Sequence, residues 1–316
     1  MTNRTFAVVA VTVLVAGVIT ARLGVNQYYY FAAYVVLQYV VLATAWNILG
    51  GYTGYVNFGT PAFFALGAYT AVVLIKSIKA PLAAQLVAGA AVAGVLGFAI
   101  GYLTLRLRGV FFSIATLALA VVLQTMFINW DYTGGARGVT LARPPVAPFG
   151  ASYVEFLFVV MLGLAVVAVA TARWIEGSWI GRGLAAIRDN EEAAECMGVP
   201  TLRLKLVATT VSGVLMGLAG APFPYYLTFV EPTSVFDLNY AVNSLAMPMI
   251  GGSTTWIGPV IGAVLLGTAQ QIAMVTISSA LNLLLVGLIL VAFVILAPEG
   301  IVGLVQRLTR ASRSRA

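Results

Sequence analysis

Charge is scarce in this 316-residue chain: only 9% of its residues are charged, whereas 61% are hydrophobic. An average soluble domain carries roughly 25% charged residues. So few charges cannot cover a globule of this size with a water-soluble surface, and lipid is the solvent that remains. The composition therefore excludes a soluble domain and predicts an all-α polytopic membrane protein.

Histidine is absent, and cysteine occurs once, at Cys196. A single cysteine cannot form a disulfide within the chain, and the usual Cys and His ligands of a zinc or haem site are missing. No Gly-Lys pair occurs either, so the sequence lacks the phosphate-binding loop of an ATPase. We therefore expect no metal, no cofactor and no enzymatic activity of the chain itself, only a transport role.

What the chain does contain is long apolar runs, and a bilayer core needs about 20 such residues per helix. Ten runs predict about ten transmembrane helices, with eight or nine as alternatives, because the eighth run is short. The runs are Phe6–Leu23, Tyr28–Leu49, Thr60–Ile78, Leu82–Leu105, Val110–Trp130, Tyr153–Trp174, Leu206–Leu227, Leu238–Ile250, Pro259–Ile277 and Leu281–Ala297.

Lysine and arginine fall unevenly on the two sides of these predicted spans. With the N-terminus inside, 12 of the 17 basic residues are cytoplasmic and 5 are outside. This bias predicts that both termini lie in the cytoplasm. It also spreads the net charge of +7 along the membrane edges, which favours lipid over nucleic acid as a partner. We expect residues 1–305 to form one transmembrane domain, and the basic tail 306–316 to lie against anionic lipid.

One long polar loop, residues 175–205, interrupts the apolar pattern on the predicted cytoplasmic side. Its periodicity predicts a single short amphipathic helix over 183–198. Gly198 is placed as a left-handed C-terminal cap, and Pro200 stops the helix. Acidic residues outnumber basic ones here, which favours docking to a protein over contact with anionic headgroups. The expected apolar face comprises Leu184, Ile187, Ala194 and Met197, and the acidic face Asp189, Glu192 and Glu195.

At this loop the chain resembles the membrane permease subunits of the branched-chain amino acid class of ABC importers. The stretch GRGLAAIRDNEEAAECMGV is similar to their coupling loop, and stretches beginning at Trp46, Gly109 and Met249 resemble the same family. The likeness runs from about Tyr28 to Gly300. It implies that ATPase subunits contact the loop through Gly183, Arg188, Asp189, Glu192, Ala193, Ala194 and Gly198.

The resemblance also implies partners and a location. A second homologous permease subunit, two ATP-hydrolysing subunits at the cytoplasmic face and an extracytoplasmic substrate-binding protein would assemble in a bacterial inner membrane. The implied substrates are branched-chain or similar small amino acids, with amides and urea left open. A self-sufficient secondary carrier or channel is the alternative, although the spans lack the acidic or histidine relay that such carriers use.

Two glycine-rich stretches, residues 50–61 and 251–259, break the apolar pattern. Both begin Gly-Gly-x-Thr, and both follow a span that is predicted to run inward. Paired broken segments indicate a translocation path, since unwound backbone is tolerated only where protein or a cavity surrounds it. Close helix packing is the alternative explanation of the glycines. The candidate path residues are Asn47, Gly50, Gly51, Thr53, Asn57, Gly251, Gly252 and Ser253.

Overall fold

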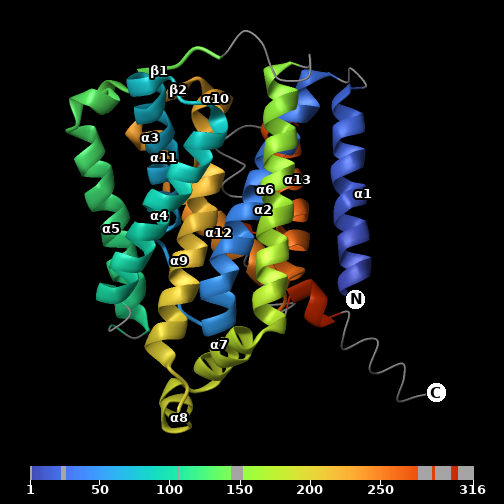
Figure 1. Ribbon diagram of the computed structural model, residues 1–316, viewed down its shortest axis with the longest axis vertical. Coiled ribbons are helices and arrows are strands. Elements are labelled where there is room, and N and C mark those ends of the chain that lie inside the picture. The colour runs from blue at the N-terminus through green and yellow to red at the C-terminus, as the bar shows by residue number, and fades with distance from the viewer. Residues whose placement is uncertain are drawn as a thin grey trace.

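The computed structural model describes residues 2–22, 26–104, 107, 109–143, 152–276, 287–288 and 300–304. Over this part of the chain it is a bundle of α-helices, most of them aligned with its long axis (Figure 1). The predicted all-α polytopic membrane fold is confirmed. The helices before the polar loop are α1 (Asn3–Arg22), α2 (Gln27–Thr53), α3 (Thr60–Ile78), α4 (Leu82–Thr104), α5 (Val110–Ile128) and α6 (Tyr153–Gly177).

The polar loop and the C-terminal half follow α6. The helices here are α7 (Trp179–Asp189), α8 (Glu191–Cys196), α9 (Thr201–Gly220), α10 (Phe223–Leu227), α11 (Pro232–Val235), α12 (Leu238–Gly251) and α13 (Gly258–Thr276).

Seven helical segments of the described chain are long and apolar enough to cross a membrane: α1 to α6, and α9 continued through α10. The eighth predicted span forms α12, whose 14 residues extend only about 21 Å, less than a bilayer core of about 30 Å. The ninth coincides with α13. The tenth, Leu281–Ala297, and the tail 306–316 lie outside the described residues, so about ten spans remains an approximate number.

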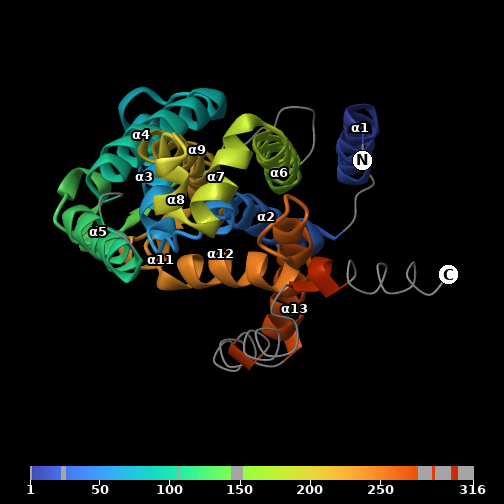
Figure 2. The same ribbon diagram turned by 90° about the horizontal axis from the view of Figure 1, so that it is seen from below.

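Helix α2 occupies the centre of the bundle and packs against α6, α9, α12 and α13. Seen along the bundle, α5 lies at one edge and α1 at the other (Figure 2). The C-terminal half of α2, from Val40 to Thr53, is buried throughout. By contrast only 11% of the apolar window of α1 is buried, which leaves that helix to face lipid.

Small residues bring α3, α4 and α9 into close contact. A Cβ atom added to Gly217 would lie 2.7 Å from the carbonyl oxygen of Gly89. One added to Gly67 would collide with the carbonyl oxygen of Gly217. Such close backbone approach is how helices associate in lipid, where the hydrophobic effect does not drive them together.

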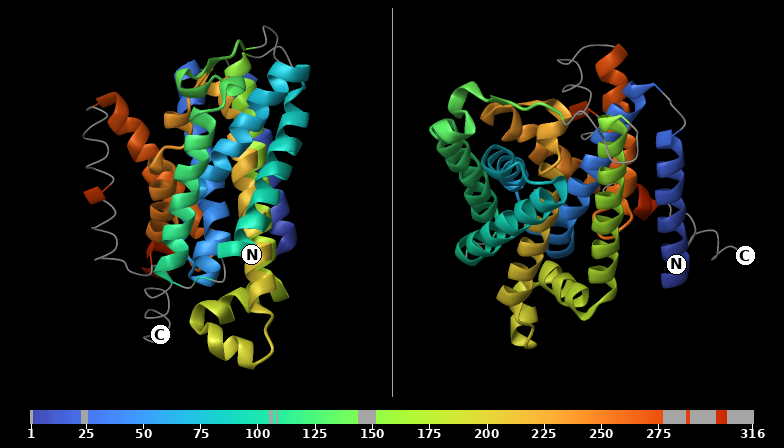
Figure 3. Two further views of the ribbon diagram at one scale, coloured as in Figure 1. Left: turned by 90° about the vertical axis from the view of Figure 1, so that its left-hand side faces the viewer. Right: turned by 45° about the horizontal axis from the view of Figure 1, so that its top comes forward.

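The two ends of the bundle differ (Figure 3). Helices α7 and α8 project from one end, and the start of α1 points toward the same end (Figure 1). We call residues 179–198 the knob and this end the knob end. The far end carries the short helices η1 (Asp131–Thr133) and η2 (Gly135–Arg137), and the strand β1 (Val139–Thr140), which pairs antiparallel with β2 (Phe229–Val230).

Candidate functional site

The knob begins where α6 ends at Gly177 and Ser178 caps α7. The Ser178 hydroxyl accepts a hydrogen bond from the Gly181 N–H at 3.4 Å, as serine commonly does at this position. Helix α7 then buries Leu184 and Ile187 against the bundle. These two residues form the apolar face that the periodicity predicts.

The expectation of a single helix over 183–198 is wrong, because the chain bends at Asn190. Its backbone is extended (φ −164°, ψ 108°), and its side-chain oxygen accepts a hydrogen bond from the Ala193 N–H at 3.0 Å. Asparagine is among the strongest helix N-caps, so it ends α7 and starts α8 in a new direction. Asn190 followed by two glutamates was the local signal for this second helix start.

The C-terminal end of α8 agrees with the sequence-based prediction. Gly198 has φ +83°, and its N–H donates to the carbonyl oxygen of Glu195 at 2.9 Å. The Val199 N–H donates to the carbonyl oxygen of Ala194 at 3.0 Å. Pro200 follows, and α9 begins at Thr201. The knob is therefore closed at this end by a turn that needs glycine.

The bend at Asn190 changes which side chains of α8 face outward. Ala194 is buried, as expected, but Met197 is 84% exposed, so its assignment to the apolar buried face is wrong. The solvent-facing surface of α8 thus combines acidic groups with one large apolar side chain. The exposed residues of α8 and of the turn that follows it are Glu192, Ala193, Glu195, Cys196, Met197 and Gly198.

Arg188 connects the knob to the end of α2. Its Nη1 donates to the carbonyl oxygen of Gly51 at 3.5 Å, and its Nε lies 3.5 Å from a carboxylate oxygen of the exposed Asp189. The last carbonyl groups of a helix attract a cation. Among the predicted knob residues, Arg188 therefore contacts the first glycine-rich stretch, and Glu192, Ala193 and Gly198 face solvent.

A buried ion pair that the sequence reasoning missed lies under α8. The Lys205 Nζ is 2.6 Å from Oε1 of Glu191, and the two side chains are only 3% and 14% exposed. The Tyr55 hydroxyl donates to Oε2 of Glu191 at 2.5 Å, and Lys205 also lies 3.2 Å from that hydroxyl. Lys205 at the start of an apolar run was the available signal, because a charge there needs a partner.

The first break is shorter than predicted. Helix α2 continues through Gly50, Gly51 and Thr53, so only residues 54–59, which we call the unwound segment, are non-helical. The neighbours of this segment satisfy its backbone polar groups. The Trp46 Nε1–H donates to the carbonyl oxygen of Asn57 at 2.8 Å, and the Ser113 hydroxyl to that of Val56 at 2.8 Å.

The second break, residues 252–257, follows α12 and lies against the end of α2. The Asn47 amide donates to the carbonyl oxygen of Thr255 at 3.4 Å, and a Cβ on Gly51 would collide with the carbonyl oxygen of Ser253. The two glycine-rich stretches therefore meet at the knob end of the bundle. Seven of the eight candidate path residues are buried, and Ser253 is half-buried. Their contacts within this single chain are those of close packing, and a path along them stays a prediction.

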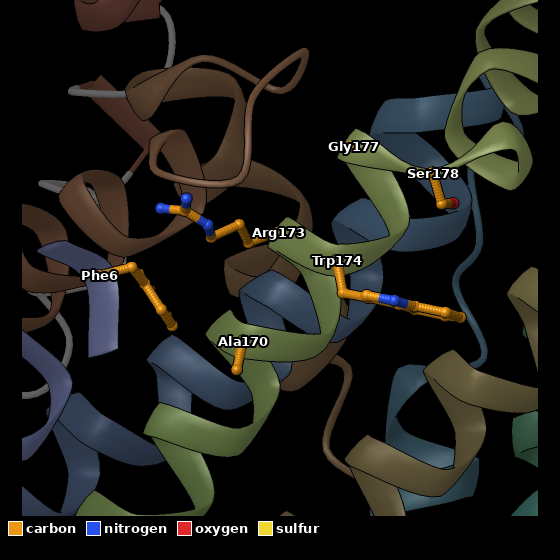
Figure 4. Close-up of a pocket in the computed structure, with 6 residues that line it drawn as sticks. All are labelled: Phe6, Ala170, Arg173, Trp174, Gly177 and Ser178. Atoms are coloured by element: carbon orange, nitrogen blue, oxygen red, sulfur yellow. The ribbon is translucent and has the colours of Figure 1, made fainter. Parts of the chain in front are cut away.

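Helix α6 holds the second break from the other side. Glu176 accepts hydrogen bonds from the Trp256 N–H at 2.5 Å and from the Tyr52 hydroxyl at 3.3 Å. The Arg173 guanidinium carbon lies 4.7 Å from the centroid of the Phe6 ring and 5.5 Å from that of Trp256. Arg173 points toward α1 in Figure 4, beside a pocket of about 380 Å³ lined by Phe6, Ala170, Arg173, Trp174, Gly177 and Ser178.

The chain matches a family model over residues 28–294, and the model describes the permease component of the branched-chain amino acid transport system. The match covers most of the chain, including the knob and both breaks. The chain belongs to this family. The resemblance seen in the sequence is thereby confirmed.

Two curated relatives carry branched-chain amino acid transport in their names. The permease is 27% identical over 288 residues to the high-affinity permease protein LivM of Escherichia coli strain K12, covering 83% of this chain and 67% of LivM. It is 26% identical over 280 residues to the probable permease protein LivH of Methanocaldococcus jannaschii, covering 84% and 88%.

A sugar permease is also similar, over a shorter part of the chain. The ribose import permease protein RbsC of Bacillus subtilis strain 168 is 27% identical over 179 residues, 51% of this chain and 55% of RbsC. No solved structure matches this permease.

Proposed function

We propose that this permease is one membrane subunit of an ATP-driven importer and that it forms part of the path for branched-chain or similar small amino acids. The extent of similarity supports this substrate class. The relatives named for branched-chain amino acid transport align over more than four-fifths of the chain, whereas the ribose permease aligns over half. The candidate path is the junction of the end of α2 and the first glycine-rich stretch with residues 252–257.

The proposed partners follow from the family. They are two ATP-hydrolysing subunits, an extracytoplasmic substrate-binding protein and a second homologous permease subunit, embedded with this chain in lipid. The distribution of lysine and arginine supports an orientation with the N-terminus and the knob in the cytoplasm of a bacterial cell. The far end, with β1 and β2, would then face the binding protein.

The observation that carries the proposal is the exposed surface of α8. An ATPase subunit would bury the Met197 side chain in a groove and meet Glu192 and Glu195 with basic groups. Apolar burial supplies most of the affinity in such a contact, while exposed charges guide association. Gly183, Arg188 and Asp189 on α7, with Ala194 on α8 and Gly198 in the turn after it, would hold this surface in place.

The single cysteine of the chain allows a direct test, because Cys196 is exposed on α8. A maleimide probe is added to the purified permease with and without the ATPase subunit. We expect docking to slow labelling of Cys196 by about tenfold or more, since docked protein covers the thiol.

A matched control moves the thiol to the far end of the bundle. In the double variant Cys196→Ser, Thr140→Cys the new thiol lies on the exposed Thr140 position of β1. Its labelling rate should not respond to the ATPase subunit. Equal labelling of Cys196 with and without a bound ATPase subunit would contradict docking at the knob.

A further inference from the structure

We infer that Tyr55, Glu191 and Lys205 form a buried joint that transmits the position of the docked knob to the unwound segment between α2 and α3. The inference rests on the proposed function, because it concerns what happens after an ATPase subunit has docked. It assigns to these three residues a positioning role in coupling, separate from docking itself.

The joint brings together three parts of the chain that are distant in sequence. Glu191 is the first residue of α8, Lys205 lies in the first turns of α9, and Tyr55 belongs to the unwound segment. Each oxygen of the Glu191 carboxylate has its own partner: Oε1 lies 2.6 Å from Lys205, and Oε2 accepts from the Tyr55 hydroxyl at 2.5 Å. The Lys205 Nζ also lies 4.6 Å from the centroid of the Tyr55 ring.

The adjacent residues Glu191 and Glu192 of α8 point in different directions. Glu192 faces solvent, where a partner reaches it, whereas Glu191 points inward to Tyr55 and Lys205. A force on the outer surface of α8 therefore reaches Glu191 through one turn of helix. Of the knob residues, Arg188 adds a parallel link, to the carbonyl oxygen of Gly51 just before the unwound segment.

The contact is suited to transmitting movement because it cannot stretch gradually. Separating a buried carboxylate from its ammonium partner leaves both charges uncompensated, which costs far more than displacing an apolar contact. The knob must therefore move Tyr55 with it or break the joint entirely. Packed contacts with two discrete arrangements are the usual basis of switching in proteins.

On its other side Tyr55 is fixed to the bundle. Its ring makes an edge contact with Phe112 of α5 at a centroid distance of 5.2 Å. The next residues are tied to the same helix: the Ser113 hydroxyl donates to the carbonyl oxygen of Val56, and the Phe58 N–H donates to the Thr116 hydroxyl oxygen at 3.1 Å. Displacing Tyr55 must therefore break these contacts with α5 or move α5 together with the unwound segment.

The test compares coupling with docking in the reconstituted importer. Tyr55→Phe removes the hydroxyl and keeps the ring on Phe112. The double variant Glu191→Gln, Lys205→Met removes both charges together and leaves no unpaired charge behind. Tyr102→Phe, at an exposed tyrosine of the membrane-spanning helix α4, is the matched control.

Three quantities are measured: protection of Cys196 by the ATPase subunit, ATP hydrolysis, and the number of leucine molecules taken up per ATP hydrolysed. We expect protection to persist in both test variants. The ratio of leucine to ATP should fall by about tenfold, the effect of losing a buried hydrogen bond to a charged group. Tyr102→Phe should keep the wild-type ratio.

The outcomes separate this inference from the proposed function. If protection and the leucine-to-ATP ratio are both unchanged in Tyr55→Phe, the joint does not transmit coupling and the inference is wrong. A purely structural role would lower yield, hydrolysis and uptake together and leave the ratio intact, which also overturns it. If Cys196 of the wild-type chain is not protected at all, the proposed docking fails instead.

Discussion

Truncating Met197 should weaken docking of the ATPase subunit without disturbing the permease. The side chain is 84% exposed in the isolated chain, so almost all of it is available for burial in a partner. Burying a methionine side chain contributes about 1.5–3 kcal/mol, and alanine keeps only its first carbon. A loss of about 2 kcal/mol corresponds to about 30-fold weaker binding.

Met197 should also contribute more binding free energy to docking than the acidic residues beside it. Exposed ion pairs contribute only about 0–1 kcal/mol, and salt screens them. Truncating Met197 should therefore raise Kd more than neutralising Glu192, and its effect should persist at high salt. Charge neutralisation should mainly slow association and lose its effect as the ionic strength rises.

Binding is measured by titrating the ATPase subunit onto detergent-purified permease, with Met197→Ala and Met197→Asp beside the wild type. Met126→Ala is the matched control, because Met126 is also exposed but lies in the membrane-spanning α5, toward the far end. We expect both Met197 variants to bind the ATPase subunit with a higher Kd than the wild type, and Met126→Ala to bind it with the wild-type Kd. An unchanged Kd in Met197→Asp would show that no groove in a partner holds this side chain.

Three further predictions concern charge, packing and the cap. Glu192→Lys should abolish ATP-coupled uptake and protection of Cys196 by the ATPase subunit, while membrane insertion is kept. Asp131→Lys, at an exposed acid of the far end, should leave that protection unchanged, and equal protection in both variants would count against an acidic docking surface. Gly217→Ala should destabilise the bundle by about 1–3 kcal/mol in detergent unfolding, because its Cβ would meet Gly89 and Ala93. Gly163→Ala, which meets no atom within 4 Å, should not lower the melting temperature, so equal losses would refute the packing argument. Gly198→Ala should speed hydrogen exchange in α8 by about tenfold, since a left-handed alanine costs about 1–2 kcal/mol; unchanged exchange would contradict the cap.

The sequence predicted those features of the knob that depend on neighbouring residues. Gly198 and Pro200 end a helix through local backbone conformation, so their role can be predicted without knowing the fold. Leu184 and Ile187 follow the period of one continuous helix and are buried as predicted. The period failed beyond Asn190, because a capping side chain restarted the helix there and turned Met197 outward.

The joint under the knob was not predictable in the same way. Tyr55 and Lys205 are 150 positions apart, and nothing in either local sequence specifies the other as a partner. Lys205 did indicate that some partner must exist, since a charge at the start of an apolar helix is costly. Which acid supplies it depends on how α8 lies against α9, and that is a property of the packed bundle.

The glycine-rich stretches illustrate an intermediate case. Their repeated Gly-Gly-x-Thr pattern correctly marked two places where helices end at the same end of the bundle. It did not show that α2 stays helical through Thr53, because close contact with the second break holds Gly51 in the helix. We propose that the pair lines a path together with the second permease subunit of the proposed importer.

We propose that this permease moves solute only when an ATPase subunit acts on the knob. The most direct measurement is leucine uptake into proteoliposomes that contain the permease subunits and the binding protein, with the ATPase subunits and ATP either present or omitted. We expect leucine to accumulate in the complete system, and no leucine movement in either direction of the gradient when the ATPase subunits are absent. Sustained leucine movement through the permease without the ATPase would contradict it and favour a self-sufficient carrier or channel.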